Sequence, residues 1–208
     1  MTMKIQRLNN YYTDENTYLV YDGNTALVID PGYKTDGILK AAADAKTTIQ
    51  YILITHCHYD HIEFMEDLRE KTNAKLVSGD KASINITDPD INLTLAGLGK
   101  AVSAKKSDII LKDGETLPVG NMQVKCIYTP GHTNCGTCYL IENHLFSGDT
   151  LFLRNCGRWD LPTGDEETLI RSVKNKIYTL DDEIIIHPGH GEQTTVGYEK
   201  KFNLYIKE

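Results

Sequence analysis

The strongest constraint on this chain is a cluster of metal-binding side chains at the end of an apolar run. Residues 50–54 have the length and composition of a buried strand, and His56-Cys57-His58-Tyr59-Asp60-His61 follows almost at once. In open α/β sheets, ligands collect where strands end. Burying so many polar groups is costly without a cation that joins them. The segment therefore predicts a metal site at the edge of a sheet.

The spacing within this segment separates two pairs of ligands. In an extended chain, residues two apart point to the same side, so His56 and His58 can reach one metal ion. If a helix begins at Asp60, then Asp60 and His61 face elsewhere and can serve a second ion. The apolar stripe that would pack such a helix is present as Ile62, Met65 and Leu68. One segment can therefore supply ligands to two ions.

Length, charge and hydropathy narrow the class of protein. The 208 residues suit a single domain that spans 1–208, with 40% hydrophobic and 25% charged residues. The 22 Lys and Arg residues against 29 Asp and Glu leave a net charge of -7 without a basic run, so we expect no nucleic-acid partner. No stretch approaches the ~20 apolar residues of a membrane span, and the N-terminus lacks an apolar leader core. These features predict a cytoplasmic protein with no membrane partner.

Five cysteines form an odd and scattered set, which argues against a disulfide framework. Cys135 and Cys138 form a Cys-x-x-Cys motif with two interpretations, a redox pair or two small residues at the start of a strand. The second is favoured because residues 139–141 have a strand pattern, whereas a thioredoxin-like motif leads into a helix. Cys57 should point away from the ion of its neighbouring histidines and support them by packing rather than bind metal itself.

The rest of the chain alternates strands and helices in two similar halves. A long polar segment, residues 83–107, has weak periodicity and is either a lid near the site or a plain surface insertion. Strands are predicted at 16–21, 25–29, 50–54, 75–77, 109–111, 122–128, 139–141, 144–146 and 183–186, and helices from Thr35, Asp60 and Asp165 and over 198–206.

Four predicted strand ends offer metal ligands. Besides the histidine-rich turn, His132 follows residues 122–128, Asp149 follows 144–146, and His190 follows 183–186. Five histidines and two aspartates make two sites of three protein ligands each, if one carboxylate is shared as a bridge. Such sites leave an open position for water, as catalysis requires. The seven candidate ligands are His56, His58, Asp60, His61, His132, Asp149 and His190.

With these segments the chain resembles metallo-β-lactamase-fold hydrolases, specifically the glyoxalase II-like (hydroxyacylglutathione hydrolase-like) branch. The matching motifs are H-x-H-x-D-H at residues 56–61, G-H-T at 131–133, G-D-T-L-F at 148–152 and P-G-H-G at 188–191, in the family's order. Supporting matches are Asp30-Pro31-Gly32, residues 88–94, and Gly157-Arg158-Trp159-Asp160-Leu161-Pro162.

The resemblance implies an α+β fold, a four-layer αββα sandwich with the site at one edge. It assigns one ion to His56, His58 and His132 and the other to Asp60, His61 and His190, with Asp149 as the bridge. Asp60 and Asp149 are the expected catalytic carboxylates. Supporting roles are expected for Asp30, Cys57, Arg158 and Asp160, with an Arg158–Asp160 pair that orients Asp149. Two glycines of the family are replaced by Glu63 and Phe64, which predicts a narrower substrate channel.

The resemblance implies a hydrolase of a small thioester that uses two divalent ions, with zinc as the default and iron or manganese as alternatives. Metal binding lowers the pKa of water from 15.7 to about 7, which supplies hydroxide at neutral pH. A thiolate leaves without a strong general acid because its conjugate pKa is about 8.5, whereas an amide nitrogen needs one. A carboxylate bridge, where well-known zinc β-lactamases have a cysteine, points away from antibiotic hydrolysis.

Two other classes of function fit part of the pattern. A mononuclear iron dioxygenase that acts on persulfides is similar at residues 55–58 and 155–158, and would bind Fe(II) through His56, His132 and Asp149. His190 favours the hydrolase because it completes a second site. A metal-stabilised binding module is disfavoured, since structural zinc sites are closed by four protein ligands.

Overall fold

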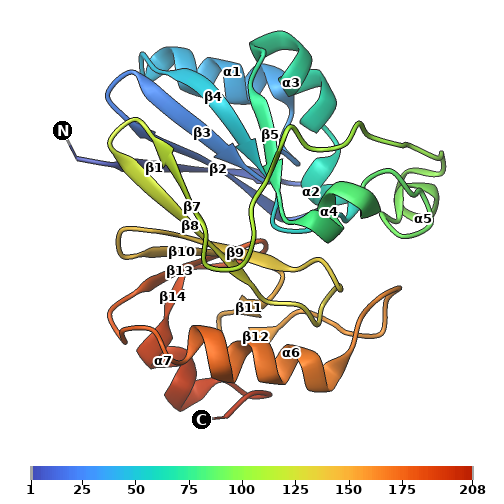
Figure 1. Ribbon diagram of the computed structural model, residues 1–208, viewed down its shortest axis with the longest axis vertical. Coiled ribbons are helices and arrows are strands. Elements are labelled where there is room, and N and C mark those ends of the chain that lie inside the picture. Colours follow the sequence, from blue (N-terminus) through green and yellow to red (C-terminus); the bar gives the residue numbers. More distant parts are fainter. Residues whose placement is uncertain (1, 208) are drawn as a thin grey trace.

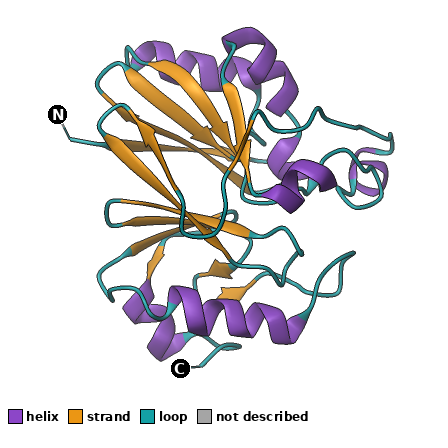
Figure 2. Ribbon diagram, viewed as in Figure 1, coloured by secondary structure: helices purple, strands orange, loops and turns teal. Residues whose placement is uncertain are grey.

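The chain folds into four layers, with two stacked β-sheets between two layers of helices (Figures 1 and 2). The computed structural model describes residues 2–207. The expected αββα sandwich is confirmed. The N-terminal sheet has the order β1-β2-β3-β4-β5-β6. Its strands are β1 (Lys4–Asn10), β2 (Glu15–Asp22), β3 (Thr25–Ile29), β4 (Thr48–Leu53), β5 (Lys75–Ser78) and β6 (Ile109–Ile110).

The second sheet has the order β14-β13-β10-β9-β8-β7. In it, β10 and β13 are parallel neighbours, and the other pairs are antiparallel. Its strands are β7 (Thr116–Val119), β8 (Met122–Tyr128), β9 (Thr137–Ile141), β10 (His144–Gly148), β13 (Ile185–Pro188) and β14 (Thr194–Thr195), and a separate small ribbon is formed by β11 (Leu151–Phe152) and β12 (Asn155–Cys156).

Helices cover the outer face of each sheet (Figure 2). The N-terminal sheet is covered by α1 (Thr35–Asp44) and α3 (Met65–Thr72), and short helices lie at its edge: α2 (Tyr59–Ile62), α4 (Asp80–Asn85) and α5 (Thr94–Leu98). The second sheet is covered by α6 (Glu166–Ser172), which continues into a π-helical turn, η1 (Val173–Ile177), and by α7 (Val196–Phe202). Among residues 2–207, every helix is too short or too polar to cross a bilayer.

Three apolar clusters fill the spaces between the four layers. Side chains alternate along a strand, so Leu19 of β2 faces the helices while Tyr18 and Val20 pack between the sheets. The third cluster joins the second sheet to α6 and η1 through residues such as Leu145 and Leu169. Fully burying one such side chain contributes roughly 1.5–3 kcal/mol. Both faces of each sheet are therefore buried, which holds the strand ends in place.

Some predicted elements differ from those in the structure. β1 and β7 were not predicted, because β1 is a polar, partly exposed edge strand and β7 is a four-residue strand containing a proline. The predicted helix over 198–206 is wrong at both ends. Thr195 caps α7 by accepting from Tyr198 N, and the helix stops at Phe202, after which Asn203 Oδ1 accepts from the backbone amides of 205 and 206.

The segment 83–107 is organised around two buried polar side chains. Asn92 donates to the carbonyls of Ile86 and Val102, both at 3.0 Å, and Thr94 accepts from Val102 N at 2.9 Å. The segment also reaches the histidine-rich turn. A Cβ on Gly97 of α5 would lie 2.3 Å from the ring of Tyr59, so α5 packs directly on this ring. The segment is therefore a packed excursion whose helix α5 touches the predicted site region.

Candidate metal centre

The predicted ligands meet at one edge of the two sheets. Residues 56–61 follow β4, His132 follows β8, Asp149 follows β10 directly, and His190 follows β13. β10 and β13 are parallel, with Gly148 paired to Pro188, so the residues after them emerge side by side. In Figure 1, α2, which contains Asp60 and His61, lies beside the strand ends. Parallel pairing thus brings Asp149 and His190 together, while residues 56–61 come from the other sheet and His132 from β8.

The first group consists of three buried imidazoles, those of His56, His58 and His132. Their exposed fractions are 2%, 4% and 4%, and their ligand atoms lie within 4.8 Å of one another. His58 Nδ1 lies 3.0 Å from His132 Nε2. Two nitrogens bound to one tetrahedral zinc at 2.0–2.1 Å are roughly 3.3 Å apart. The spacing therefore suits two ligands of one ion.

The second group consists of Asp60, His61 and His190, whose ligand atoms also lie within 4.8 Å of one another. Asp60 Oδ2 lies 3.4 Å from His190 Nε2 and 3.9 Å from His61 Nε2. His61 is fully buried, whereas the side chain of His190 is 25% exposed. This group is therefore more open to solvent than the first.

Asp149 lies between the two groups. Its Oδ1 is 3.3 Å from His61 Nε2, and its Oδ2 is 3.6 Å from both His132 Nε2 and His190 Nε2. A Cβ on Gly189 would lie 2.3 Å from Asp149 Oδ1 and 2.6 Å from His61 Cε1, so only glycine fits there. One carboxylate thus faces ligand atoms of both groups.

Several ligand atoms are buried without a hydrogen bond. Among the described residues, His56 Nε2, His61 Nε2 and Asp149 Oδ1 have no hydrogen-bond partner. An unsatisfied buried polar atom costs about 1–3 kcal/mol, so three at one place call for a cation. Imidazole and carboxylate are ligands of zinc, iron and manganese. The donor set therefore fits divalent metal ions.

The outer nitrogens of three histidines are held by hydrogen bonds. His61 Nδ1 lies 3.0 Å from Asp30 Oδ2, and His132 Nδ1 lies 2.6 Å from the carbonyl oxygen of Arg158. Thr55 donates its hydroxyl to Asp30 Oδ2, at 2.6 Å, so His56 Nδ1 can donate to Thr55 Oγ1, at 3.1 Å. In each case the proton on Nδ1 leaves the Nε2 lone pair free for a metal.

The pKa values reflect the same arrangement. Burial lowers the pKa of His56, and burial together with His132 lowers the pKa of His58 to about 3. Burial also opposes protonation of His61, but the carboxylates of Asp149 and Asp60 outweigh it and raise its pKa. Despite its burial, Asp149 has a lowered pKa because of His61 and His190. His56 and His58 are thus neutral imidazoles, the form that binds metal.

The supporting residues partly follow the expectation. Asp30 is buried, and besides its bond to His61 it accepts from Thr55 N at 2.7 Å. Arg158 and Asp160 do form an ion pair, with two contacts of 2.7 Å, but their side chains are 62% and 63% exposed. The Arg158 side chain is therefore directed to solvent. Arg158 contacts the candidate ligands through its backbone carbonyl, which holds His132.

Cys57 lies in the histidine-rich turn, and Glu63 and Phe64, which replace two glycines of the family, follow α2 directly. Cys57 is fully buried in the apolar cluster beneath α1 and α3, with its Sγ 3.9 Å from the carbonyl of Ile91. Cys138 lies in β9, as the strand interpretation of its motif predicts. Glu63 and Phe64 line a cleft of about 440 Å³ that Leu98 and neighbouring residues of 94–104 close on the other side.

Sequence reasoning missed one residue that contacts the His190 loop, Asn16. Asn16 N donates to Gly189 O at 2.7 Å, and its Nδ2 donates to the carbonyls of Pro188 and Gly191, at 3.1 and 2.9 Å. Its neighbour Glu15 is fully buried and pairs with His190 through the backbone. A polar residue at the start of a strand carries no signal for this role, because the contact spans more than 170 residues.

Comparison with known proteins agrees with this geometry. A family model described as the Metallo-beta-lactamase superfamily matches residues 12–190, a range that includes all seven candidate ligands. This chain belongs to the metallo-beta-lactamase superfamily. Among curated members of the superfamily, it is 31% identical over 202 residues to hydroxyacylglutathione hydrolase GloC of Haemophilus influenzae, with 92% of each chain covered.

Solved structures of the superfamily show the same fold. The BLEG-1 B3 metallo-beta-lactamase has a TM-score of 0.92 and 30% identity, covering 99% of this chain and all of that one. ETHE1 from Myxococcus xanthus has a TM-score of 0.81 and 28% identity, covering 97% and 83%. TTHA1623 in a di-iron-bound form has a TM-score of 0.85 and 28% identity, covering 97% and 100%. The fold is thus shared with a protein named as a metallo-beta-lactamase, with ETHE1 and with a di-iron-bound protein, so the fold alone does not single out one activity.

Proposed function

We propose that the protein is a dinuclear metal-dependent hydrolase of small thioesters. The position of Asp149 carries this proposal. Its two oxygens face His61 of one group, at 3.3 Å, and His132 of the other, at 3.6 Å. A carboxylate so placed can bind two cations at once, and its charge offsets part of their mutual repulsion.

We assign His56, His58 and His132 to one ion, Asp60, His61 and His190 to the other, and Asp149 to both. Two bound ions would supply hydroxide near neutral pH and a positive charge for the carbonyl oxygen of the substrate. The protein holds the imidazole rings in place through Asp30, Thr55 and the Arg158 carbonyl. A thiolate leaves without help from a strong acid, so the ligand set itself suffices for thioesters.

Zinc is the proposed ion, because five imidazoles and two carboxylates suit it, with iron or manganese as alternatives. The similarity to a protein solved in a di-iron-bound form supports iron as the first alternative. The similarity to hydroxyacylglutathione hydrolase GloC supports a thioester of a small thiol as the substrate. The cleft at Glu63 and Phe64 is the proposed approach to the site.

Hydrolysis of a panel of substrates tests this proposal. The panel contains small acyl thioesters of glutathione and of other thiols, matched oxygen esters, and a β-lactam. We expect thioesters to be cleaved fastest. Asp149→Asn, which keeps the shape but removes the charge, should lower thioester turnover by about a hundredfold or more. If no thioester is cleaved, or if Asp149→Asn keeps the wild-type rate, the proposal is wrong.

The second candidate is a mononuclear iron dioxygenase that acts on persulfides, which the similarity to ETHE1 favours. It would use His56, His132 and Asp149 as the two-histidine, one-carboxylate face of a single iron. His132 Nε2 and Asp149 Oδ2 are 3.6 Å apart, which suits shared ligation. Oxygen uptake on glutathione persulfide separates the two functions, because the hydrolase consumes no oxygen.

A further inference from the structure

Two cysteines next to the candidate metal centre lie beside each other. Cys57 lies in the turn between His56 and His58, and Cys135 follows His132 by three residues. Thr137 N donates to Thr55 O at 2.9 Å, so the two segments run side by side. Cys57 and Cys135 are each two residues from this bond and belong to the same buried cluster, where their thiols are hydrogen-bonded to each other.

We propose that Cys57 and Cys135 form an oxidisable thiol pair, which hydrogen peroxide converts into a disulfide that links the His56–His61 turn to the loop of His132. Neither residue is among the metal ligands proposed above. Nothing in the disulfide chemistry depends on the thioesterase proposal, although its effect on metal binding rests on the assignment of His56, His58 and His132 to one ion.

The surroundings of Cys135 favour attack by its sulfur. Besides Cys57, the Thr133 hydroxyl lies 3.3 Å from Cys135 Sγ, and the side chain of Asn85 also contacts it. These contacts stabilise a thiolate. The hydrogen bond with Cys57 lowers the pKa of Cys135 to about 7 against the opposing effect of burial. Thiolates, not thiols, are the nucleophiles, so Cys135 reacts first.

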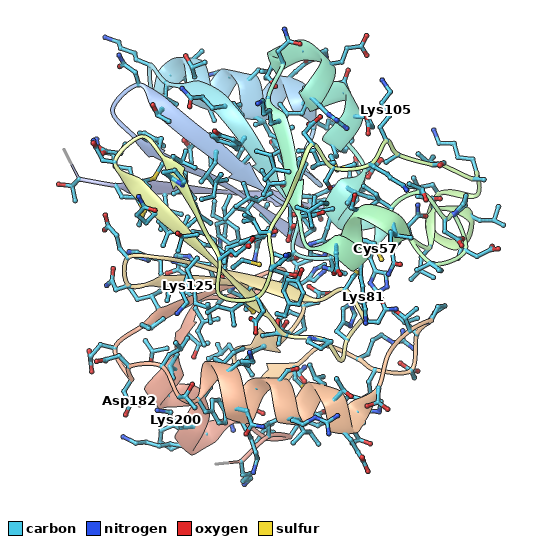
Figure 3. The ribbon with its side chains drawn as sticks, in the orientation of Figure 1. Cys57, Lys81, Lys105, Lys125, Asp182 and Lys200 are labelled. Atoms are coloured by element: carbon cyan, nitrogen blue, oxygen red, sulfur yellow. The ribbon has the colours of Figure 1, made fainter. Side chains whose placement is uncertain are left out.

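A small oxidant has a route to Cys135. The residue is 4% exposed and lines a cavity of about 120 Å³ together with Asp80, Lys81 and Tyr128. Asp80 and Lys81 are exposed at the start of α4, so the cavity meets solvent there. Figure 3 shows Cys57 and Lys81 at the same edge of the molecule, beside α4. Cys57 is fully buried, so the oxidant reaches it only through Cys135.

The chemistry balances in two steps. The Cys135 thiolate attacks one oxygen of the peroxide, the O–O bond breaks, hydroxide leaves and takes up a proton as water, and a sulfenic acid remains. The Cys57 sulfur then attacks the sulfenic sulfur, the S–O bond breaks, and the OH leaves as a second water with the Cys57 proton. Two thiols and one peroxide give one disulfide and two waters.

The disulfide would disturb the first ion. A disulfide brings two sulfurs to about 2.05 Å, so hydrogen-bonded thiols must move together. Cys57 is flanked by His56 and His58, and its movement shifts the backbone that carries both imidazoles. Disturbing the contacts that orient a ligand costs about 10–100-fold in metal affinity. Oxidation is therefore expected to release metal, and a dithiol reductant is expected to restore binding.

Peptide mapping of the metal-loaded protein tests the pair. The protein is exposed to hydrogen peroxide, denatured, alkylated and digested. We expect a peptide pair linked through Cys57 and Cys135, lighter by two hydrogen atoms, while Cys126, Cys138 and Cys156 are alkylated. Cys57→Ser should accumulate a sulfenic acid on Cys135, trapped by a sulfenic-acid-specific reagent, and give no link. Cys126→Ser, a matched change at another fully buried cysteine, should keep the link.

The proposal is overturned if peroxide leaves both Cys57 and Cys135 as alkylatable thiols, or if Cys135 is oxidised while wild-type Cys57 stays free. Both outcomes are read from wild-type protein, so a variant that fails to fold does not affect them. Metal release is followed in parallel with a chromogenic chelator. A link that forms without metal release contradicts the expected effect on the first ion and leaves the thiol pair established.

Discussion

Replacing Asn16 by alanine tests how the loop of His190 is positioned. The change removes the two bonds from Asn16 Nδ2 to the carbonyls of Pro188 and Gly191. Neither carbonyl is left unpaired, because Pro188 O also accepts from Tyr18 Oη at 2.7 Å and Gly191 O from Arg7 Nη1 at 3.0 Å. Asn16 Oδ1 also accepts from Asn9 Nδ2 at 3.0 Å, and Asn9 Nδ2 keeps Asp14 Oδ1 as an acceptor after the change. The loss is therefore that of three ordinary hydrogen bonds, roughly 0.5–1.5 kcal/mol each. We expect the free energy of unfolding to fall by about 1.5–4.5 kcal/mol.

The same change should act more strongly on metal binding than on the fold. His190 would keep its ring, but its loop would lose the two hydrogen bonds from Asn16 Nδ2. The affinity for the second ion should therefore fall by about 10–100-fold. The assay pairs denaturant unfolding with metal titration. Asn121→Ala is the control, because Asn121 donates from its own Nδ2 to Asp22 Oδ2, at 2.8 Å, in a distant turn. If Asn16→Ala is destabilised as expected but binds both ions with wild-type affinity, the positioning role is refuted.

Two further predictions concern residues outside the ligand set. Arg158→Ala should leave the metal content and the melting temperature unchanged. Exposed ion pairs contribute little to stability, and the backbone carbonyl that holds His132 remains. A loss of bound metal would show that the guanidinium is needed for metal binding. His187 is 2% exposed, and burial lowers its pKa from 6.5 to about 3. The neutral side chain therefore stabilises the folded protein fully above pH 6.5, and this contribution to the free energy of unfolding is lost as the pH falls toward 3. Between pH 7 and pH 5, unfolding measurements should show wild type losing roughly 2 kcal/mol more than His187→Gln, and equal pH dependence would contradict this.

The meeting of the candidate ligands was predictable because these side chains lie at the ends of strands. His56, His132, Asp149 and His190 each follow an apolar or alternating run, and ligand-binding groups collect where strands end. The layers were predictable for a similar reason, since both faces of the central strands are buried and the strands are correspondingly apolar. These signals are local in the sequence.

The remaining features depend on contacts that no local pattern encodes. The support that His132 receives comes from the backbone carbonyl of Arg158, and any residue there could supply it. Asn16 acts on a loop more than 170 residues away, through the docking of β2 against the end of β13. β1 is a polar edge strand that is held by its pairing with β2, not by its own pattern.

Metal content per chain, measured on protein purified without added metal, tests the central claim most directly. The two groups of ligands and the shared Asp149 predict close to two ions in wild type. His190→Ala, which removes a ligand of the second group only, should retain close to one. A single ion in wild type, or two ions and full turnover in His190→Ala, would contradict the dinuclear assignment.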